Sequence, residues 1–575
     1  MSIGLGLVGG VVAPLLMKLI GFVTNLSFYG RLSSDFSSPA GNHLGAWVIV
    51  VPAIGGVIVG IMARFGSRAI RGHGIPEAME QVLEGNSRIP ARITVLKPLS
   101  AAVAIGTGGP FGAEGPIIAT GGALGSLVGQ VLSTTGAERK TLLAAGAAAG
   151  MAATFGSPVS AVLLAVELLL FEFRARSLIP VALASAVAAG VRIKLMGAEA
   201  IFSMPTVDPV GLNALALYAL LGIVIGVVAV VVTRIVYWLE DMFEHLPVHW
   251  MWWPAIGGLA VGIVGYFAPR TLGVGYDNIA DILSNRFSLH LLAFLCVMKF
   301  VSWSIALSSG TSGGTLAPLF TIGSGAGAAL GAFFLWIFPA SGLDVRVAAL
   351  VGMAAIFAGA SRALLASIIF AFETTHQTNG LLPLLVGSTL AYLIARMLMQ
   401  NSIMTEKIAR RGLRIPEDYD ADVFRQTNVQ AVMEKDVKAL PPDMLVSELA
   451  DRIAHHDPEI SSRDAWPLVG PDKQLAGIIT RNDVIRSLEK SGAANLKLSE
   501  AGNAALVTAF PDETLHEAVA RMLTHGVGRL LVVSRDDPKQ IIGYVSRTHL
   551  LSSRFRQVQQ EQVREDGWLR KRSIK

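Results

Sequence analysis

The chain has 575 residues, of which 52% are hydrophobic and only 15% are charged, whereas ordinary globular proteins carry about 25% charged residues. The charges are unevenly distributed, because 51 of the 89 Lys, Arg, Asp and Glu residues lie in positions 401–575 and 38 lie in positions 1–400. This distribution excludes a single soluble domain, a nucleic-acid-binding protein and a disordered chain. The first part of the chain needs lipid around it, and the last part needs water.

Apolar stretches in residues 1–410 predict an all-α polytopic membrane domain. A helix needs about 20 apolar residues to cross the hydrocarbon core, and several candidate segments are shorter or contain Gly or Pro. We therefore expect tilted helices and helices that stop partway through the membrane. No basic residues precede the first segment, which favours a retained membrane helix over a cleaved signal peptide. The candidate segments are 3–26, 44–63, 92–106, 116–133, 140–155, 158–173, 178–196, 212–237, 253–268, 288–308, 318–338, 346–359, 363–373 and 380–400.

Basic residues predict how this domain is oriented. Arg64, Arg68 and Arg71 follow the second segment, and Arg174 and Arg176 follow the segment that ends at residue 173. Loops rich in Lys and Arg face the cytoplasm. We expect both loops, and the charged C-terminal region with them, to lie on the cytoplasmic side.

The membrane domain is a duplication. GMAATF at Gly150 recurs as GMAAIF at Gly352, and Pro116 matches Pro318 at the same offset of 202 residues. Agreement of several motifs at one offset predicts two related halves, at about 3–196 and 212–400. Duplicated membrane folds often place the substrate near the midplane, where interrupted helices from both halves meet.

A soluble α/β module follows a linker at 411–427. Residues 428–488 and 498–556 each predict a strand–helix–strand–strand–helix unit, with WPLVG and LAGIIT in the first and RLLVV and IIGYV in the second. Residues 557–575 predict a basic, solvated tail that is also suited to anionic lipid.

Three Gly- and Pro-rich stretches interrupt the apolar segments: GHGIPE (72–77), GTGGPFGAEGP (106–116) and SGGTLAP (312–318). In lipid, non-helical backbone persists only where protein or a wet cavity surrounds it. We expect a helix to begin just after each Pro, with its free N–H groups and positive end directed at the interruption. Glycine lets the backbone approach closely, so these stretches predict a site for a small anion.

These motifs resemble the three signature stretches of the CLC chloride channels and transporters, and the tandem α/β units resemble the CBS domains that follow many of them. The resemblance implies an inverted-repeat bundle, not an enzyme. It also implies a homodimer with one chloride pathway per subunit, no required cofactor and no nucleic-acid partner. A bacterial plasma membrane location with a cytoplasmic C-terminus follows from the same resemblance. The N-terminal cytoplasmic helix common in the family is not apparent, since the apolar stretch begins at Ile3.

Roles carried over from the family place a gate and an anion site in these stretches. Glu114 in GAEGP matches the gating glutamate, whose carboxylate competes with chloride at the outer site. The positions that match the chloride-binding residues are Gly72, His73, Gly112, Ala113, Gly115, Thr315, Leu316, Ala317 and Met404.

The chain departs from the family pattern at several of these positions. His73 replaces a serine, and two interpretations remain open: the imidazole donates an N–H to the anion, or it turns toward cytoplasmic water. Met404 replaces a tyrosine and offers no hydroxyl, while Ala113 replaces a basic residue that is often present. A second glutamate used by the exchangers falls at Leu168, which cannot carry a proton.

Leu168 favours a passive, gated chloride channel over a chloride/proton antiporter, although some exchangers lack that glutamate and Glu172 lies one turn further on. An intramembrane metalloprotease with CBS domains would need HExxH on a membrane helix, but His516–Glu517 continues as AVAR in the soluble part. A cation transporter should show buried carboxylates facing its cavity, whereas the interruptions of the apolar segments here offer helix N-termini.

The soluble module carries a nucleotide motif. Thr480 and Asp483 in GIITRND fit the CBS pattern in which a hydroxyl and a carboxylate hold an adenine nucleotide. The second copy has Ser546, but His549 replaces its carboxylate. A dimerisation and gating module without ligand is an equal alternative.

Overall fold

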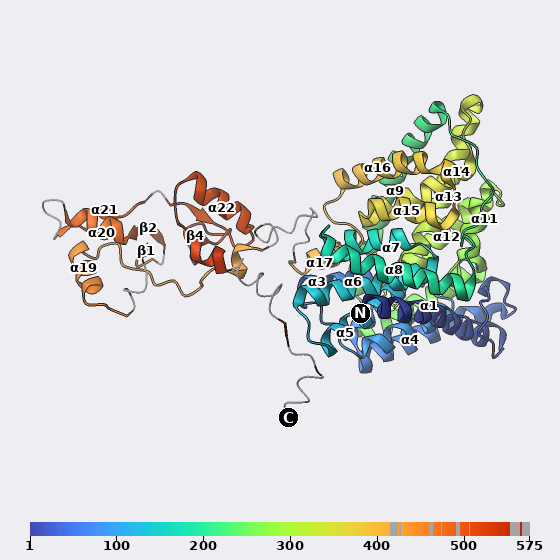
Figure 1. The fold of residues 1–575 in the computed structure, drawn as a ribbon, viewed down its shortest axis with the longest axis horizontal. Helices are drawn as coiled ribbons and strands as arrows, with labels where there is room; N and C mark the ends of the chain where they lie inside the picture. The colour runs from blue at the N-terminus through green and yellow to red at the C-terminus, as the bar shows by residue number, and fades with distance from the viewer. Residues whose placement is uncertain are drawn as a thin grey trace. The chain divides into compact units, whose positions relative to one another are not determined.

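The computed structural model describes residues 1–413, 424, 427–458, 460, 464–472, 474–489, 495–504, 506–552, 564, 565 and 568. The chain forms two compact units (Figure 1), one of residues 1–420 with the chain end from 564 and one of residues 421–563. Most of the predicted linker at 411–427 and most of the basic tail at 557–575 lie outside the described residues.

The first unit consists of two helical halves followed by a short helix. The first half contains α1 (Ser2–Thr24), α2 (Val50–Ile61), α3 (Ile75–Leu83), α4 (Ile93–Gly106), α5 (Glu114–Val131), α6 (Gly136–Phe155), α7 (Pro158–Ala165) and α8 (Ala175–Met196). The second half contains α9 (Leu212–Glu244), α10 (Trp253–Phe267), α11 (Tyr276–Leu283), α12 (Leu289–Ser308), α13 (Leu316–Ile337), α14 (Val345–Ser361), α15 (Leu364–Thr375) and α16 (Leu381–Leu398). The short helix α17 (Glu406–Arg410) comes next.

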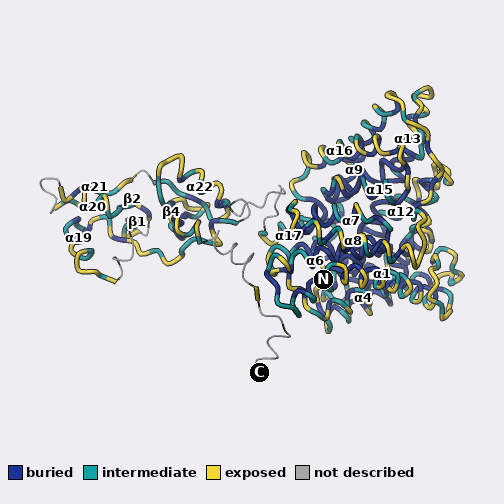
Figure 2. Tube along the Cα trace, viewed as in Figure 1, coloured by how far each residue is buried: buried dark blue, intermediate teal, exposed yellow. Residues whose placement is uncertain are grey.

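The helices of this unit are those of a membrane protein. Within the described residues, eight are long and apolar enough to cross a bilayer, and several others are shorter apolar helices. Their outer faces expose large apolar side chains such as Phe65, Leu212 and Trp336, whereas the chain inside the bundle is buried (Figure 2). Lipid rather than water suits such a surface. The predicted polytopic helical membrane fold is therefore confirmed.

Glycine contacts pack equivalent helix pairs of the two halves. A Cβ atom on Gly121 of α5 would lie 2.2 Å from the carbonyl oxygen of Gly146 in α6. In the other half, a Cβ on Gly323 of α13 would lie 2.5 Å from the carbonyl oxygen of Gly352 in α14. Without side chains at these positions the backbones approach directly, as in many membrane helix pairs.

Two buried lysines also occupy equivalent positions in the two halves. Lys97 in α4 and Lys299 in α12 are 202 residues apart and fully buried. Each ammonium group donates hydrogen bonds of 2.8–3.1 Å to two carbonyl groups of the loop before a short helix: Lys97 to Ile70 and Gly72, and Lys299 to Thr271 and Gly273. These bonds satisfy a charge that would otherwise be costly to bury.

The second unit contains two small α/β repeats. The first has α19 (Val446–Ala454), β1 (Ala465–Val469), β2 (Leu475–Thr480) and α20 (Arg481–Leu488), and α21 (Leu498–Ala501) follows it. The second has β3 (Thr508–Ala509), α22 (Leu515–Thr524), β4 (Arg529–Val533) and β5 (Ile541–Ser546), followed by helical residues 547–552. β1 pairs antiparallel with β2, while β4 pairs parallel with β3 and antiparallel with β5. The expected first strand of the first repeat is reduced to a single bridge between Leu440 and Leu468.

The chain end contacts the helical unit to which it belongs. Glu565 accepts a hydrogen bond of 3.0 Å from Arg139, a buried side chain in the first turn of α6, and another from Arg88. Burial would raise the pKa of Glu565, but the two arginines outweigh it and hold this pKa below its usual value. The bond supplies a carboxylate to a guanidinium at a helix N-terminus, where the helix dipole disfavours positive charge.

Candidate anion-binding site

Backbone hydrogen bonds bring the three Gly- and Pro-rich stretches together. Gly112 and Gly314 exchange N–H···O bonds of 3.2 and 3.0 Å, and the N–H of Gly72 donates to the carbonyl of Thr311 at 3.3 Å. The N–H of Gly313 donates back to Gly72 at 3.4 Å. Segments from both halves of the duplication therefore form one non-helical junction.

Three helices begin at this junction, at Ile75 for α3, Glu114 for α5 and Leu316 for α13. We predicted that each helix starts just after its proline, and this is wrong by two or three residues, since the prolines lie inside the first turn. The first four N–H groups of a helix have no partner within it, so a proline there removes no helical hydrogen bond. The positive ends of three helices remain directed at the junction.

Only glycine fits where the loop after Arg71 meets α5. A Cβ on Gly115 would lie 2.0 Å from the carbonyl oxygen of His73, and one on Gly74 would lie 2.5 Å from the carbonyl oxygen of Gly115. Gly74 also has φ of +94°, a conformation that other residues rarely adopt. The close backbone approach explains the glycines of GHGIP and GAEGP.

Polar atoms without partners collect at the junction. Among the described residues, His73 Nδ1, Glu114 Oε2 and Thr315 Oγ1 are buried and accept or donate no hydrogen bond. Most buried polar atoms in proteins have a partner, and each exception calls for an explanation. Two of the three atoms can carry a hydrogen to donate, which suits an anionic ligand.

Glu114 is the first residue of α5 and is fully buried. Its Oε1 accepts a hydrogen bond of 3.0 Å from the hydroxyl of Tyr276, and the backbone amides of Glu114 and Ala317 face the same carboxylate. A Cβ on Gly314 would lie 3.1 Å from Oε2. The carboxylate thus lies between the starts of α5 and α13, where helix N-termini attract negative charge.

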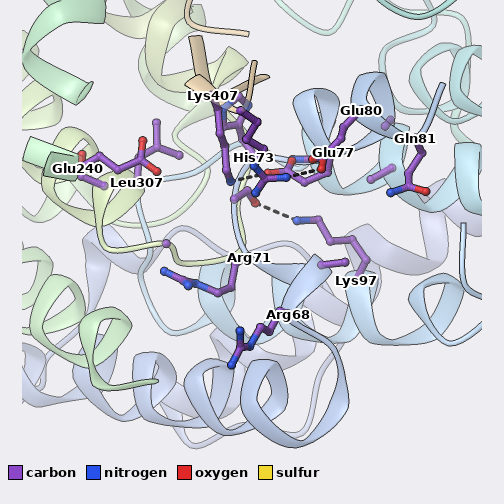
Figure 3. A pocket seen from close by; sticks show the side chains of 18 of the residues that line it. Arg68, Arg71, His73, Glu77, Glu80, Gln81, Lys97, Glu240, Leu307 and Lys407 are labelled. Carbon is purple, nitrogen blue, oxygen red and sulfur yellow. Dashed lines mark hydrogen bonds and ion pairs between the residues drawn. The ribbon is translucent and has the colours of Figure 1, made fainter. Parts of the chain in front are cut away.

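A cavity of about 560 Å³ opens on the other side of His73. Its lining mixes Arg68, Arg71 and Lys407 with carboxylates, and Figure 3 shows His73, Glu77 and Lys407 close together in it. Glu77 accepts a hydrogen bond of 2.7 Å from the N–H of Gly74 and one of 3.1 Å from Lys407. His73 therefore stands between a polar cavity and the buried start of α5.

Met404 is fully buried, and its neighbour Ile403 lines the cavity. The hydroxyl of Ser402 accepts the N–H of Met404 at 3.2 Å, and a tyrosine from another helix, Tyr237 of α9, donates to the carbonyl of Ile403 at 2.8 Å. Nothing in the sequence around position 404 could have indicated Tyr237, because it lies 167 residues earlier.

Leu168 is buried in a π-helical turn, Val166–Leu170, at the end of α7. The adjacent carboxylate of Glu167 accepts the N–H groups of Leu365 and Ala366 at 2.9 Å each and so caps α15. Glu373 in α15 caps α7 in return, accepting the N–H groups of Val159 and Ser160 at 2.9 and 2.8 Å. We did not predict these reciprocal caps between the two halves.

Glu172, the carboxylate one turn further on, is bonded to the first turn of α8. It accepts a hydrogen bond of 2.5 Å from Ser177 and lies 3.8 Å from the guanidinium of Arg174.

Most of the predicted anion-binding residues meet at the junction. Gly72, His73, Gly112, Ala113, Gly115, Thr315, Leu316 and Ala317 all belong to the three paired stretches and are buried. Met404 instead lies next to Ile403, which lines the cavity. Within the described part of the chain, no group of three or more His, Cys, Asp or Glu residues is placed to hold a metal ion.

The predicted nucleotide residues of the soluble unit occupy equivalent positions after β2 and β5. Thr480 Oγ1 donates to Asp483 at 2.6 Å, and the pair caps α20. In the second repeat the N–H of Ser546 donates to His549 Nδ1 at 3.3 Å. Burial lowers the pKa of His549, against the opposing influence of Glu434. Glu434, which we had not predicted, accepts the hydroxyl of Tyr544 at 2.5 Å and lies 3.7 Å from His549.

Comparison with known families agrees with this architecture. The family model described as "Voltage gated chloride channel" matches residues 54–396. The chain belongs to this family, the CLC proteins. The CBS domain model matches residues 429–490 and 500–555. Chloride transport across a membrane is therefore its activity class, and CLC proteins are channels and transporters rather than enzymes.

Similar proteins span plants and microorganisms. The chain is 29% identical to "Chloride channel protein CLC-f" of Arabidopsis thaliana over 561 aligned positions, which cover 85% of this chain and 71% of the relative. Its fold is similar to that of "a slow cyanobacterial Cl-/H+ antiporter" (TM-score 0.65, 24% identity, 71% of this chain and 96% of that one). It is also similar to "a eukaryotic CLC transporter" (TM-score 0.61, 19% identity, 95% and 97%).

The unpartnered Nδ1 of His73 leads to a test of its role in this CLC protein. We expect His73→Ala to weaken chloride binding about tenfold or more, because one hydrogen bond to a charged group contributes about 1.5–3 kcal/mol. His73→Ser restores a donor and should recover much of the affinity. Isothermal titration of the purified protein with chloride measures both. His245→Ala, at an exposed histidine, provides the control. If the His73→Ala protein binds chloride as tightly as the parent protein does, the imidazole instead turns toward cytoplasmic water.

Proposed function

We propose that the chain is a passive, gated chloride channel, with helix N-termini and His73 binding the anion and Glu114 acting as the gate. The observation that carries the passive mode is Leu168. This buried apolar side chain stands where the exchangers of the family use a glutamate, and it cannot accept a proton.

The neighbouring carboxylates support the same proposal, because both already have structural partners. Glu167 caps α15, and Glu172 is bonded to Ser177. A glutamate that caps a helix is stabilised in its charged form by the N–H groups. A proton carrier must gain and lose its proton during each cycle, which such a cap opposes.

Paired flux measurements in reconstituted vesicles test the passive mode. With an outward chloride gradient and the membrane potential clamped, we expect chloride efflux with no proton uptake against the proton gradient. Protein-free vesicles give the background leak. Uphill proton movement driven by chloride would reject the channel and establish the antiporter.

The chloride/proton antiporter is the second candidate. Two structures of similar fold are described as a Cl-/H+ antiporter and as "a CLC-type fluoride/proton antiporter" (TM-score 0.58, 23% identity, 70% of this chain and 95% of that one). Identities below 25% support the fold rather than the coupling mode. We therefore favour the channel over the antiporter because Leu168 stands at the position of the exchangers' glutamate.

The remaining features of the proposal rest on the family resemblance and the charge pattern. We place the protein in a bacterial plasma membrane as a homodimer, with one pathway in each subunit. The arginines after α2 and α7 favour a cytoplasmic C-terminus. Modulation by the CBS domains, with an adenine nucleotide at Thr480 and Asp483, stays a prediction, as does the possibility that they act without ligand.

A further inference from the structure

The loop before α11 repeats the loop before α3. GVGYDN (273–278) matches GHGIPE (72–77) at an offset of 201 residues, a match that we did not predict. Both glycines of each loop have positive φ, +90° and +94° in the first and +69° and +77° in the second. Lys97 holds one loop and Lys299 holds the other through paired carbonyl bonds. In an inverted repeat, such equivalent loops approach the central site from opposite sides.

Tyr276 is the first residue of α11, directly after the second loop. The equivalent position after the first loop is Ile75, the first residue of α3. Its ring packs edge-on against Phe155 and Phe202, with centroids 5.9 and 5.8 Å away. Asn278 fixes the start of α11 by donating to the carbonyl of Arg270 at 2.7 Å. The side chain is therefore held by its ring as well as by its loop.

The hydroxyl of Tyr276 is directed at the start of α5. It donates to Glu114 Oε1 at 3.0 Å and faces the backbone amide of Ala113. The hydrogen bond joins residues 162 positions apart, one from each half of the duplication. A neutral donor to a carboxylate stabilises the charged form and fixes its direction.

We propose that Tyr276 is a positioning residue of the gate: its hydroxyl holds the ionised carboxylate of Glu114 between α5 and α13 and so keeps the pathway closed. The inference rests on Glu114 being the gate. Among the described residues, the other titratable group that acts on the carboxylate is Lys299 from α12. Lys299 donates its hydrogen bonds to the carbonyls of Thr271 and Gly273. The side-chain hydrogen bond to Glu114 therefore comes from Tyr276 and not from Lys299.

Tyr276→Phe removes the hydroxyl and keeps the ring among its aromatic neighbours. The ionised gate loses a donor, so protonation should release it at higher pH. We expect the pH of half-maximal chloride flux to rise by about one unit, equivalent to about 1.4 kcal/mol. The measurement is chloride efflux from vesicles over a series of symmetrical pH values. Tyr218→Phe is the matched control, since that buried hydroxyl donates to the carbonyl of Asp344 and lies in another contact.

The same pH series in a Glu114→Gln background separates the role of Tyr276 from that of Glu114. If the shift appears with Glu114 present and vanishes with Gln, Tyr276 acts through the gate. A Tyr276→Phe curve that coincides with that of the parent, or a shift that persists in the Gln background, would overturn the proposal for Tyr276. If Glu114→Gln alone keeps the parental pH dependence, the gate assignment itself fails. Equal thermal unfolding of Tyr276→Phe and the parent protein excludes a general loss of structure.

Discussion

Glu114→Gln is expected to raise chloride flux at pH 7.5 about tenfold or more and to remove its dependence on pH. Glutamine has nearly the same shape as the protonated glutamate but no ionisable group. The amide cannot compete as an anion for the positive helix ends around it. Loss of one charge-assisted hydrogen bond, worth about 1.5–3 kcal/mol, is enough for a change of this size.

Flux assays on vesicles between pH 5 and 8 measure this effect. Glu138→Gln is the matched control, because Glu138 also lies in the first turn of a helix but caps α6 through Thr135 and takes no part in the junction. Parental pH dependence in the Glu114→Gln protein would show that this carboxylate is not the gate.

Gly115→Ala is expected to reduce chloride flux at least about tenfold. The added Cβ would lie 2.0 Å from the carbonyl oxygen of His73 and 3.1 Å from the Cα of Gly314. Both neighbours are backbone atoms, so no side chain can rotate away. The loop, α5 and α13 must move apart, and the amide groups at the junction then lose their geometry. Overpacking of this kind typically costs about 1–3 kcal/mol as well.

Gly122→Ala, further along α5, distinguishes this effect from a general intolerance of the helix. Its Cβ would meet Leu143 at 3.5 Å, an ordinary contact. We expect this variant to conduct like the parent protein. Chloride titration of both purified variants shows whether the site itself is lost, and a Gly115→Ala protein with parental affinity and flux would contradict the close junction.

Local composition was sufficient to predict the membrane fold, the duplication and the three stretches of the junction. Lipid excludes water, so apolar length predicts membrane helices and a broken helix marks a protected site. A shared offset of 202 residues then paired Pro116 with Pro318. The prediction of where each helix begins was less accurate, because a proline is compatible with any position in the first turn.

Contacts between the halves could not be predicted from the sequence. Tyr276 lies in an ordinary short helix, and its role appears only when folding brings its hydroxyl to Glu114. The caps formed by Glu167 and Glu373 could not be predicted either, since each carboxylate accepts hydrogen bonds from a helix about 200 residues away. The chemistry of a stretch depends on its own residues, whereas the partners of a buried polar group depend on the packing of the whole bundle. The sequence thus singled out Glu114, and the tertiary structure decided which hydroxyl bonds to its carboxylate.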